Sequence, residues 1–198
     1  VGAPPDPMAI EGQNWFLPPP LPQRMAEEGY SSFAALLRAN MRHAGALRID
    51  HALGLARLFW IPDGGTGADG AYVGYPVKEL LGQVALESTR ANCMVIGEDL
   101  GTVPDGLRPM LTEADILGYR VLLLERTGST FNAPASYPVR AAACVTTHDL
   151  PPMAGWLEGA DLLERVALGL LPGNTDVVTE RADDQEELVE ALTAEGCL

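Results

Sequence analysis

Three acidic residues, Asp50, Glu98 and Asp149, each close a short apolar run that is typical of a buried β-strand. With their acidic residues, the runs span 46–50, 93–99 and 142–149. The carboxyl ends of parallel strands meet at one face of an α/β barrel, where such folds hold their reactive side chains. Paired carboxylates are the groups that cleave glycosidic bonds. The pattern therefore predicts one glycoside-cleaving site assembled from several strands.

Asp50 and Glu98 are the best candidate pair because they end successive predicted strands. A retaining glycosidase needs a carboxylate nucleophile and a carboxylic acid about 5–5.5 Å apart. Neighbouring strands lie about 4.8 Å apart, so side chains at matching heights would satisfy this distance. Arg48 lies two residues before Asp50, so both side chains are expected on one face of the strand. There the guanidinium would keep the Asp50 carboxylate ionised.

Two histidines lie next to the candidate carboxylates: His51 follows Asp50, and His148 precedes Asp149. An imidazole and a carboxylate together can hold a sugar hydroxyl through hydrogen bonds that strengthen in the transition state. We therefore expect both histidines to bind substrate. A histidine that is simply packed in the core is the alternative for each.

A metal centre is the main chemical alternative. The side chains that could bind a hydrolytic cation are His51, Glu98, Asp99, His148 and Asp149. Their spacing contains no HExxH or HxH pattern, and Arg48 would repel the ion. The glycines of residues 64–67 do not form a phosphate-binding loop, and no G-x-S-x-G motif is present. We therefore predict neither a metal nor a cofactor.

Composition narrows the possible partners and the compartment. A net charge of −14 argues against a nucleic acid or an anionic membrane surface as partner. The acidic run 183–187 is expected to be a solvated helix face. We expect no signal peptide, because no basic segment followed by an apolar run opens the sequence. We expect no membrane span, because no apolar stretch approaches about 18 residues. The three cysteines form no CxxC motif, so a reducing, cytoplasmic setting is predicted.

The elements that must position these residues alternate between helices and strands. Helices are predicted over 31–44 (capped by Ser31 or Ser32), 77–91, from Pro104 past residue 111, 158–170 and 184–194. Strands are predicted over 46–50, 93–98, 118–125 and 142–149. An ordered loop over 1–23, a long connection over 51–76 and a turn at 172–174 complete the chain. This alternation predicts an α/β fold with a parallel sheet, either open or part of a larger barrel.

Several motifs resemble those of the 4-α-glucanotransferases, the bacterial amylomaltases or disproportionating enzymes of the α-amylase superfamily. The motifs occupy residues 1–6, 12–15, 48–51, 59–62, 70–73, 97–101 and 147–149. The resemblance implies a (β/α)8 TIM barrel, of which this chain would supply about strands four to seven and would thus be incomplete. Residues 1–160 would form the partial barrel with the active-site motifs, and residues 161–198 a helical continuation.

The resemblance also implies a role for each catalytic residue. Asp50 would be the nucleophile, Glu98 the general acid and base, and Asp149 the residue that stabilises the transition state. Arg48 would position Asp50, and His148 would bind the sugar in the central subsite. The reaction would transfer segments of α-1,4-glucan between maltooligosaccharides or glucans with retention of configuration.

The remaining expected contacts are made by a loop and by aromatic rings. Gln13 and Trp15 would line sugar subsites, and Trp15 and Trp60 would offer apolar platforms to sugar rings. Two other functions stay open: an α-glucan hydrolase or branching enzyme of the same superfamily, and a non-catalytic glucan-binding fragment. We also expect the 198-residue chain alone to be inactive or poorly folded, because a partial barrel exposes strand edges.

Overall fold

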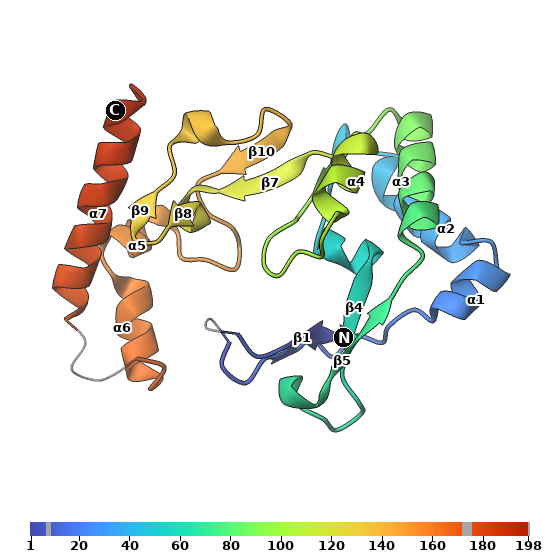
Figure 1. The fold of residues 1–198 in the computed structure, drawn as a ribbon, viewed down its shortest axis with the longest axis horizontal. Coiled ribbons are helices and arrows are strands. Elements are labelled where there is room, and N and C mark those ends of the chain that lie inside the picture. The colour runs from blue at the N-terminus through green and yellow to red at the C-terminus, as the bar shows by residue number, and fades with distance from the viewer. Residues whose placement is uncertain (7–8, 172–175, 198) are drawn as a thin grey trace. The chain divides into compact units, whose positions relative to one another are not determined.

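The computed structural model describes residues 1–6, 9–171 and 176–197, which form two compact units, 1–118 and 119–198 (Figure 1). The turn predicted at 172–174 lies outside the described residues. The predicted division near residue 160 stays a prediction. None of the described helices combines the length and the apolar character that a membrane span requires.

The described residues of the first unit form short strands, four α-helices and two 3₁₀-helices. Its strands are β1 (Gly2–Ala3), β2 (Gln13–Asn14), β3 (Ala46–Ile49), β4 (Arg57–Trp60), β5 (Ala71–Gly74) and β6 (Met94–Gly97). Its α-helices are α1 (Pro22–Glu27), α2 (Ser31–Met41), α3 (Val77–Ala91) and α4 (Leu107–Glu113). The 3₁₀-helices are η1 (Ala52–Leu55) and η2 (Gly67–Asp69).

The strands that lead to Asp50 and Glu98 pair as the sequence predicts. β3 and β6 are parallel, and their register places Ile49 opposite Gly97. Leu117 makes a parallel bridge to Ile96, and β7 (Gly118–Val121) begins at the next residue. The predicted order of parallel strands is therefore confirmed for this part of the chain.

Amphipathic helices cover this strand pair, and α2 and α3 lie side by side (Figure 1). The predicted helix 77–91 is confirmed as α3, which buries Leu80, Leu81 and Val84 in the core. The capping prediction for α2 is wrong. The helix follows Tyr30, whose backbone is left-handed at φ 60°, and no side chain caps it. Likewise α4 begins at Leu107 after Gly106, so Pro104 precedes the helix instead of opening it.

Two predictions of irregular chain are wrong. The connection 51–76 contains the antiparallel hairpin of β4 and β5, and residues 1–23 contain β1, β2 and the start of α1. The four strands form one sheet in the order β2-β1-β4-β5. β1 and β2 are two residues long and are held by pairing with distant segments, so they carry no local hydrophobic pattern. This sheet fixes the loop that carries Gln13 and Trp15.

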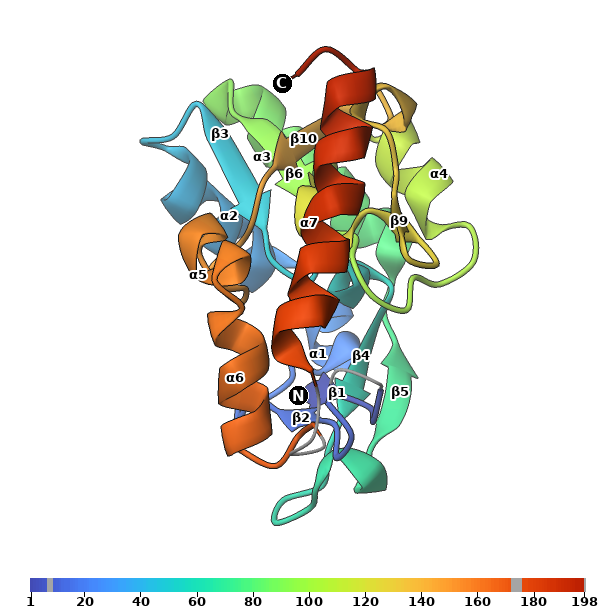
Figure 2. The ribbon, with the colours of Figure 1, turned by 90° about the vertical axis from the view of Figure 1, so that its left-hand side faces the viewer.

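In the second unit, the residues that the structure describes form short strands, three α-helices and a small core. Its further elements are η3 (Leu122–Leu124), β8 (Arg126–Thr127), β9 (Thr130–Phe131), η4 (Pro134–Ser136), β10 (Ala141–Cys144), α5 (Met153–Leu157), α6 (Ala160–Ala167) and α7 (Val177–Ala194). β7 pairs with β10, and β8 with β9. Leu123, Phe131, Trp156 and Leu188 form the buried core. Figure 2 shows α6 beside the N-terminal half of α7.

Several predicted boundaries in this unit require correction. The strand predicted over 118–125 ends at Val121, because the chain then turns into η3. The strand predicted to reach Asp149 ends at Cys144. The helix predicted over 158–170 is the shorter α6, and α5, which precedes it, is not among the predicted helices. The helix predicted over 184–194 is the longer α7.

Candidate active site

The carboxyl ends of β3 and β6 bring together four of the predicted site residues: Arg48, Asp50, His51 and Glu98. Because Ile49 lies opposite Gly97, Asp50 and Glu98 follow at the same height on neighbouring parallel strands. The Glu98 backbone N–H donates to the Ile49 carbonyl over 2.9 Å, which continues the ladder to the site. The Glu98 carbonyl in turn accepts from the Ala52 N–H at 2.9 Å. The two residues thus follow neighbouring strand ends at matching backbone positions.

Glu98 is buried, and backbone donors hold both of its carboxylate oxygens. The residue is 8% exposed. Its Oε2 accepts from the His51 N–H and its Oε1 from the Leu100 N–H, each at 2.8 Å. Two donors at fixed angles restrict the carboxylate to one orientation. Residue types give no signal for these donors, because every residue except proline carries a backbone N–H.

Asp50 has the opposite environment. Its side chain is 72% exposed and accepts a 2.5 Å hydrogen bond from Arg48 Nη1. Arg48 is more enclosed, with 27% of its side chain exposed. The guanidinium can hold the Asp50 carboxylate in place through this contact. Two carboxylates in different surroundings, one open and ion-paired and one buried and held by amides, are suited to different roles.

His51 links the two carboxylates to the loop that precedes them. Its backbone is left-handed at φ 46°, which presents its N–H to Glu98. Its imidazole lies edge-on to the Trp15 indole, with ring centroids 5.0 Å apart. The Trp15 Nε1–H donates to Gln13 Oε1 at 2.9 Å, so Gln13 orients the indole. The structure thus brings Gln13 and Trp15 to the cluster through His51.

The surroundings of His51 predict a pH-dependent stability. Burial lowers the pKa of His51 below its ordinary value of 6.5, and the nearby Glu98 and Asp50 carboxylates only partly oppose this shift. The folded state therefore favours the neutral ring. The resulting stability is complete above pH 6.5 and is lost as the pH falls through the lowered pKa, since the unfolded chain then binds more protons.

We expect His51→Asn to lose less melting temperature between pH 7.5 and 5.5 than the wild-type chain, as measured by circular dichroism. Asparagine tolerates the left-handed backbone and does not titrate. His43→Asn, at an exposed position, is the control and should keep the wild-type pH dependence. Parallel curves for wild type and His51→Asn would contradict the prediction.

Trp60 and Asp99 make structural contacts in the first unit. The Trp60 Nε1–H donates to the Tyr75 hydroxyl at 3.2 Å, and that hydroxyl donates to the Pro20 carbonyl at 2.6 Å. Trp60 also packs against the core. Asp99 is 2% exposed and accepts from Arg108 Nε at 2.8 Å, so it fixes the chain after Glu98. A sugar contact by Trp60 stays a prediction.

His148 and Asp149 lie in the second unit. Asp149 does not end a strand, because a turn held by the Leu150 N–H on the Thr147 carbonyl follows β10. His148 Nε2 lies 3.4 Å from Asp149 Oδ2, and their side chains are 71% and 75% exposed. Both side chains are open to a ligand, and their roles stay predictions.

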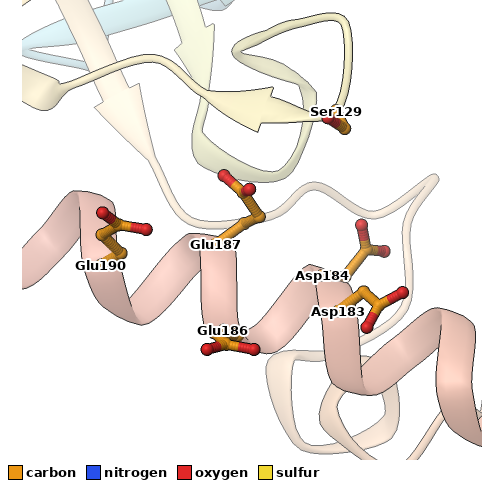
Figure 3. A pocket seen from close by; sticks show the side chains of 6 residues that line it. All are labelled: Ser129, Asp183, Asp184, Glu186, Glu187 and Glu190. Atoms are coloured by element: carbon orange, nitrogen blue, oxygen red, sulfur yellow. The ribbon is translucent and has the colours of Figure 1, made fainter.

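The acidic run of the sequence lies on α7. Figure 3 shows its carboxylates and Ser129 around a shallow hollow. Asp184 is ion-paired with Arg126 at 2.6 Å, whereas Asp183 is exposed to solvent, as expected for a helix face. Within residues 1–6, 9–171 and 176–197, no group of three or more His, Cys, Asp or Glu side chains is arranged to hold a metal ion.

Comparison with known proteins gives one consistent family. A family profile described as 4-alpha-glucanotransferase matches residues 1–197. A 4-alpha-glucanotransferase of Haemophilus influenzae is 44% identical over 200 residues, which cover 100% of this chain and 29% of the relative. One from Mycobacterium bovis is 46% identical over 192 residues, covering 92% of this chain and 26% of the relative.

Solved structures agree with these relatives. The crystal structure of amylomaltase from Corynebacterium glutamicum matches with a TM-score of 0.91 and 42% identity, covering 100% of this chain and 29% of that one. An amylomaltase from Streptococcus agalactiae, in complex with acarbose, matches with a TM-score of 0.70 and 22% identity over 91% of this chain and 38% of that one. This second likeness concerns the fold alone. The chain therefore spans about 29% of the length of the first curated relative.

Proposed function

Because this chain belongs to the 4-alpha-glucanotransferase family, we propose that it carries the catalytic pair of an enzyme that transfers α-1,4-glucan segments between maltooligosaccharides or glucans. The observation that carries the proposal is the placement of Asp50, paired with Arg48, at the height of Glu98 on a neighbouring parallel strand. Because the chain spans only 29% of the first relative, the activity is proposed for a protein that also holds the remaining segments.

In the first step, the ionised Asp50 carboxylate attacks the anomeric carbon of the donor glucan. The bond from that carbon to the leaving 4-oxygen breaks, and Glu98 gives the oxygen a proton, leaving a glycosyl ester on Asp50. In the second step, Glu98 takes the proton from an acceptor 4-hydroxyl, whose oxygen displaces Asp50. Each Glu98 oxygen accepts one backbone N–H and keeps a second lone pair, which is where the transferred proton would sit.

We assign binding roles to the other predicted residues. Asp149 and His148 would hold sugar hydroxyls and stabilise the transition state, which their exposed, adjacent side chains support. Gln13 and Trp15 would line a sugar subsite next to His51, which the ring contact supports. Trp60 would add an apolar surface. No cofactor is part of this mechanism.

We propose that β3, β6, β7 and β10 are about the fourth to seventh strands of a (β/α)8 barrel. The parallel pairing of β3 with β6 and the likeness to the Corynebacterium amylomaltase support this. In this proposal residues 1–160 belong to the barrel and residues 161–198 continue it as helices. A cytoplasmic location is supported by the three free cysteine thiols, which a reducing compartment maintains.

Incubation with maltotriose tests the proposed activity. The assay uses this chain alone and a transplant protein, defined as the Haemophilus influenzae relative in which this chain replaces the segment that it matches. We expect the transplant protein to produce glucose and a ladder of longer maltooligosaccharides, with a constant number of reducing ends, because each bond broken is replaced by a bond formed. Chromatography and a reducing-end assay measure the two quantities.

The other outcomes each point to a different function. A rising number of reducing ends indicates a hydrolase, and maltooligosaccharide binding without products indicates a non-catalytic glucan-binding protein. Loss of activity in EDTA would support the metal alternative. A ladder from the transplant protein alone, and not from the isolated chain, would fit the expectation that the chain is inactive by itself.

A further inference from the structure

Phe16 is an exposed aromatic residue in an unfavourable backbone conformation. It is 86% exposed, and its φ of 56° lies in the left-handed region that favours glycine. A bulky side chain in this region strains the backbone, and an apolar ring in water loses the benefit of burial. Strain of this kind is concentrated at functional sites, where it is part of how the site works.

The surrounding loop holds Phe16 in place. Its N–H donates to Asn14 Oδ1 at 2.9 Å, which closes a turn over Trp15. The Trp15 N–H donates to the Val1 carbonyl at 2.9 Å. The residue before Phe16 is therefore tied to β1 and its neighbours. The ring projects from a fixed support and needs little further ordering when it meets a ligand.

The same loop reaches the carboxylate pair. The preceding residue, Trp15, contacts the His51 ring, and the His51 N–H holds Glu98. A glucan chain bound across Asp50 and Glu98 has further glucose units on either side of the bond that reacts. Phe16 directly follows Trp15, the aromatic residue that contacts His51 beside the carboxylate pair.

We propose that Phe16 is a substrate-binding residue, whose ring packs against the apolar C–H face of a glucose unit beyond the one at Trp15. This inference rests on the proposed glucan transfer. A sugar ring presents hydroxyls at its rim and C–H groups on its faces, so a flat apolar ring complements the face. Because the ring would contact a glucose unit other than the one that reacts, it should strengthen substrate and transition-state binding equally and so act on KM.

Four variants of the transplant protein test this role, with maltoheptaose as substrate. In Phe16→Gly the ring is lost and the backbone is relieved, so the KM should rise about five- to tenfold with kcat unchanged. The melting temperature should stay equal or rise by up to about 4 °C. Phe16→Leu should raise the KM similarly, and Phe16→Trp should keep it near wild type. Leu17→Ala, a neighbouring exposed apolar residue, should leave the KM unchanged.

A further variant distinguishes the effect of losing the Phe16 ring from the effect of relieving a strained backbone. Asn92→Gly relieves another left-handed residue, at φ 49° after α3, and should change only the melting temperature. If Phe16→Gly lowers the melting temperature and leaves the KM unchanged, Phe16 packs against protein and the proposal is wrong. If Phe16→Gly changes neither quantity, the proposal is equally wrong.

Different results would contradict the proposed glucan transfer and the proposed role of Phe16. If the transplant protein with the wild-type sequence makes no ladder, the proposed function has failed. Equilibrium binding of maltoheptaose to the transplant protein and to its Phe16→Gly variant, measured by calorimetry, then decides the role of Phe16. About five- to tenfold weaker binding by the variant supports it. Equal affinity, or binding by neither protein, contradicts it.

Discussion

Replacing Asp50 with asparagine in the transplant protein is expected to reduce transfer from maltotriose by roughly 10⁴-fold or more. The asparagine amide is nearly the same size as the carboxylate and can still accept a hydrogen bond from Arg48, whose Nη1 lies 2.5 Å from Asp50 Oδ1. It is too weak a nucleophile to form the glycosyl ester. Because Asp50 is exposed, the substitution should not impair folding, so the loss of transfer should reflect the missing nucleophile. An unchanged melting temperature would verify that the variant is folded.

Glu98→Gln is the matched variant, since the same small change in the partner carboxylate has a different signature. Transfer from maltotriose should fall by roughly 10²–10⁴-fold, because the leaving oxygen no longer receives a proton. With α-maltosyl fluoride the first step should persist, because fluoride leaves without protonation. Azide, a nucleophile with no proton to remove, should then release the glycosyl group. The azide product of Glu98→Gln should be α-maltosyl azide, whereas Asp50→Asn should give none, because its glycosyl ester cannot form. α-Maltosyl azide from Asp50→Asn but not from Glu98→Gln would reverse the two assigned roles.

Replacing Arg181 with methionine should destabilise the chain by about 3–5 kcal/mol, measured by urea denaturation followed by Trp156 fluorescence. The Arg181 side chain is 5% exposed, and its Nη2 lies 2.9 and 2.8 Å from the two Asp161 oxygens. Its guanidinium also lies over the Trp156 ring, 4.1 Å from the centroid. The substitution leaves the Asp161 carboxylate, only 24% exposed, without its cation. It also removes the contact that links α6 to α7.

Two controls define the source of this loss. Arg42→Met, at an exposed position after α2, should change the free energy of unfolding by about 0.5 kcal/mol or less. In the double variant Arg181→Met with Asp161→Leu, most of the stability should return, because no partly buried charge is left unpaired. A loss of less than about 1 kcal/mol for Arg181→Met would show that the ion pair and the ring contact together contribute little.

The features that the sequence predicts well are those that depend on local hydrophobic patterns. Helix α3 coincides with the predicted 77–91, because apolar residues at helical spacing must all face one core. The parallel pair of β3 and β6 follows from two short apolar runs separated by a helix. Since the register aligns Ile49 with Gly97, Asp50 and Glu98 come to the same height, as the chemistry of the motifs suggested.

The features that only the tertiary structure decided depend on contacts between distant segments or on backbone groups. β1 and β2 exist because they pair with each other and because β1 also pairs with β4, which a two-residue segment cannot signal. The amides that hold Glu98 are invisible in the sequence, since every non-proline residue has one. The left-handed conformations of Phe16 and His51 are equally hidden, because neither residue is the glycine that usually marks them. Residue types thus identified the candidate chemistry and its strands, and long-range backbone hydrogen bonds determined how the site is held.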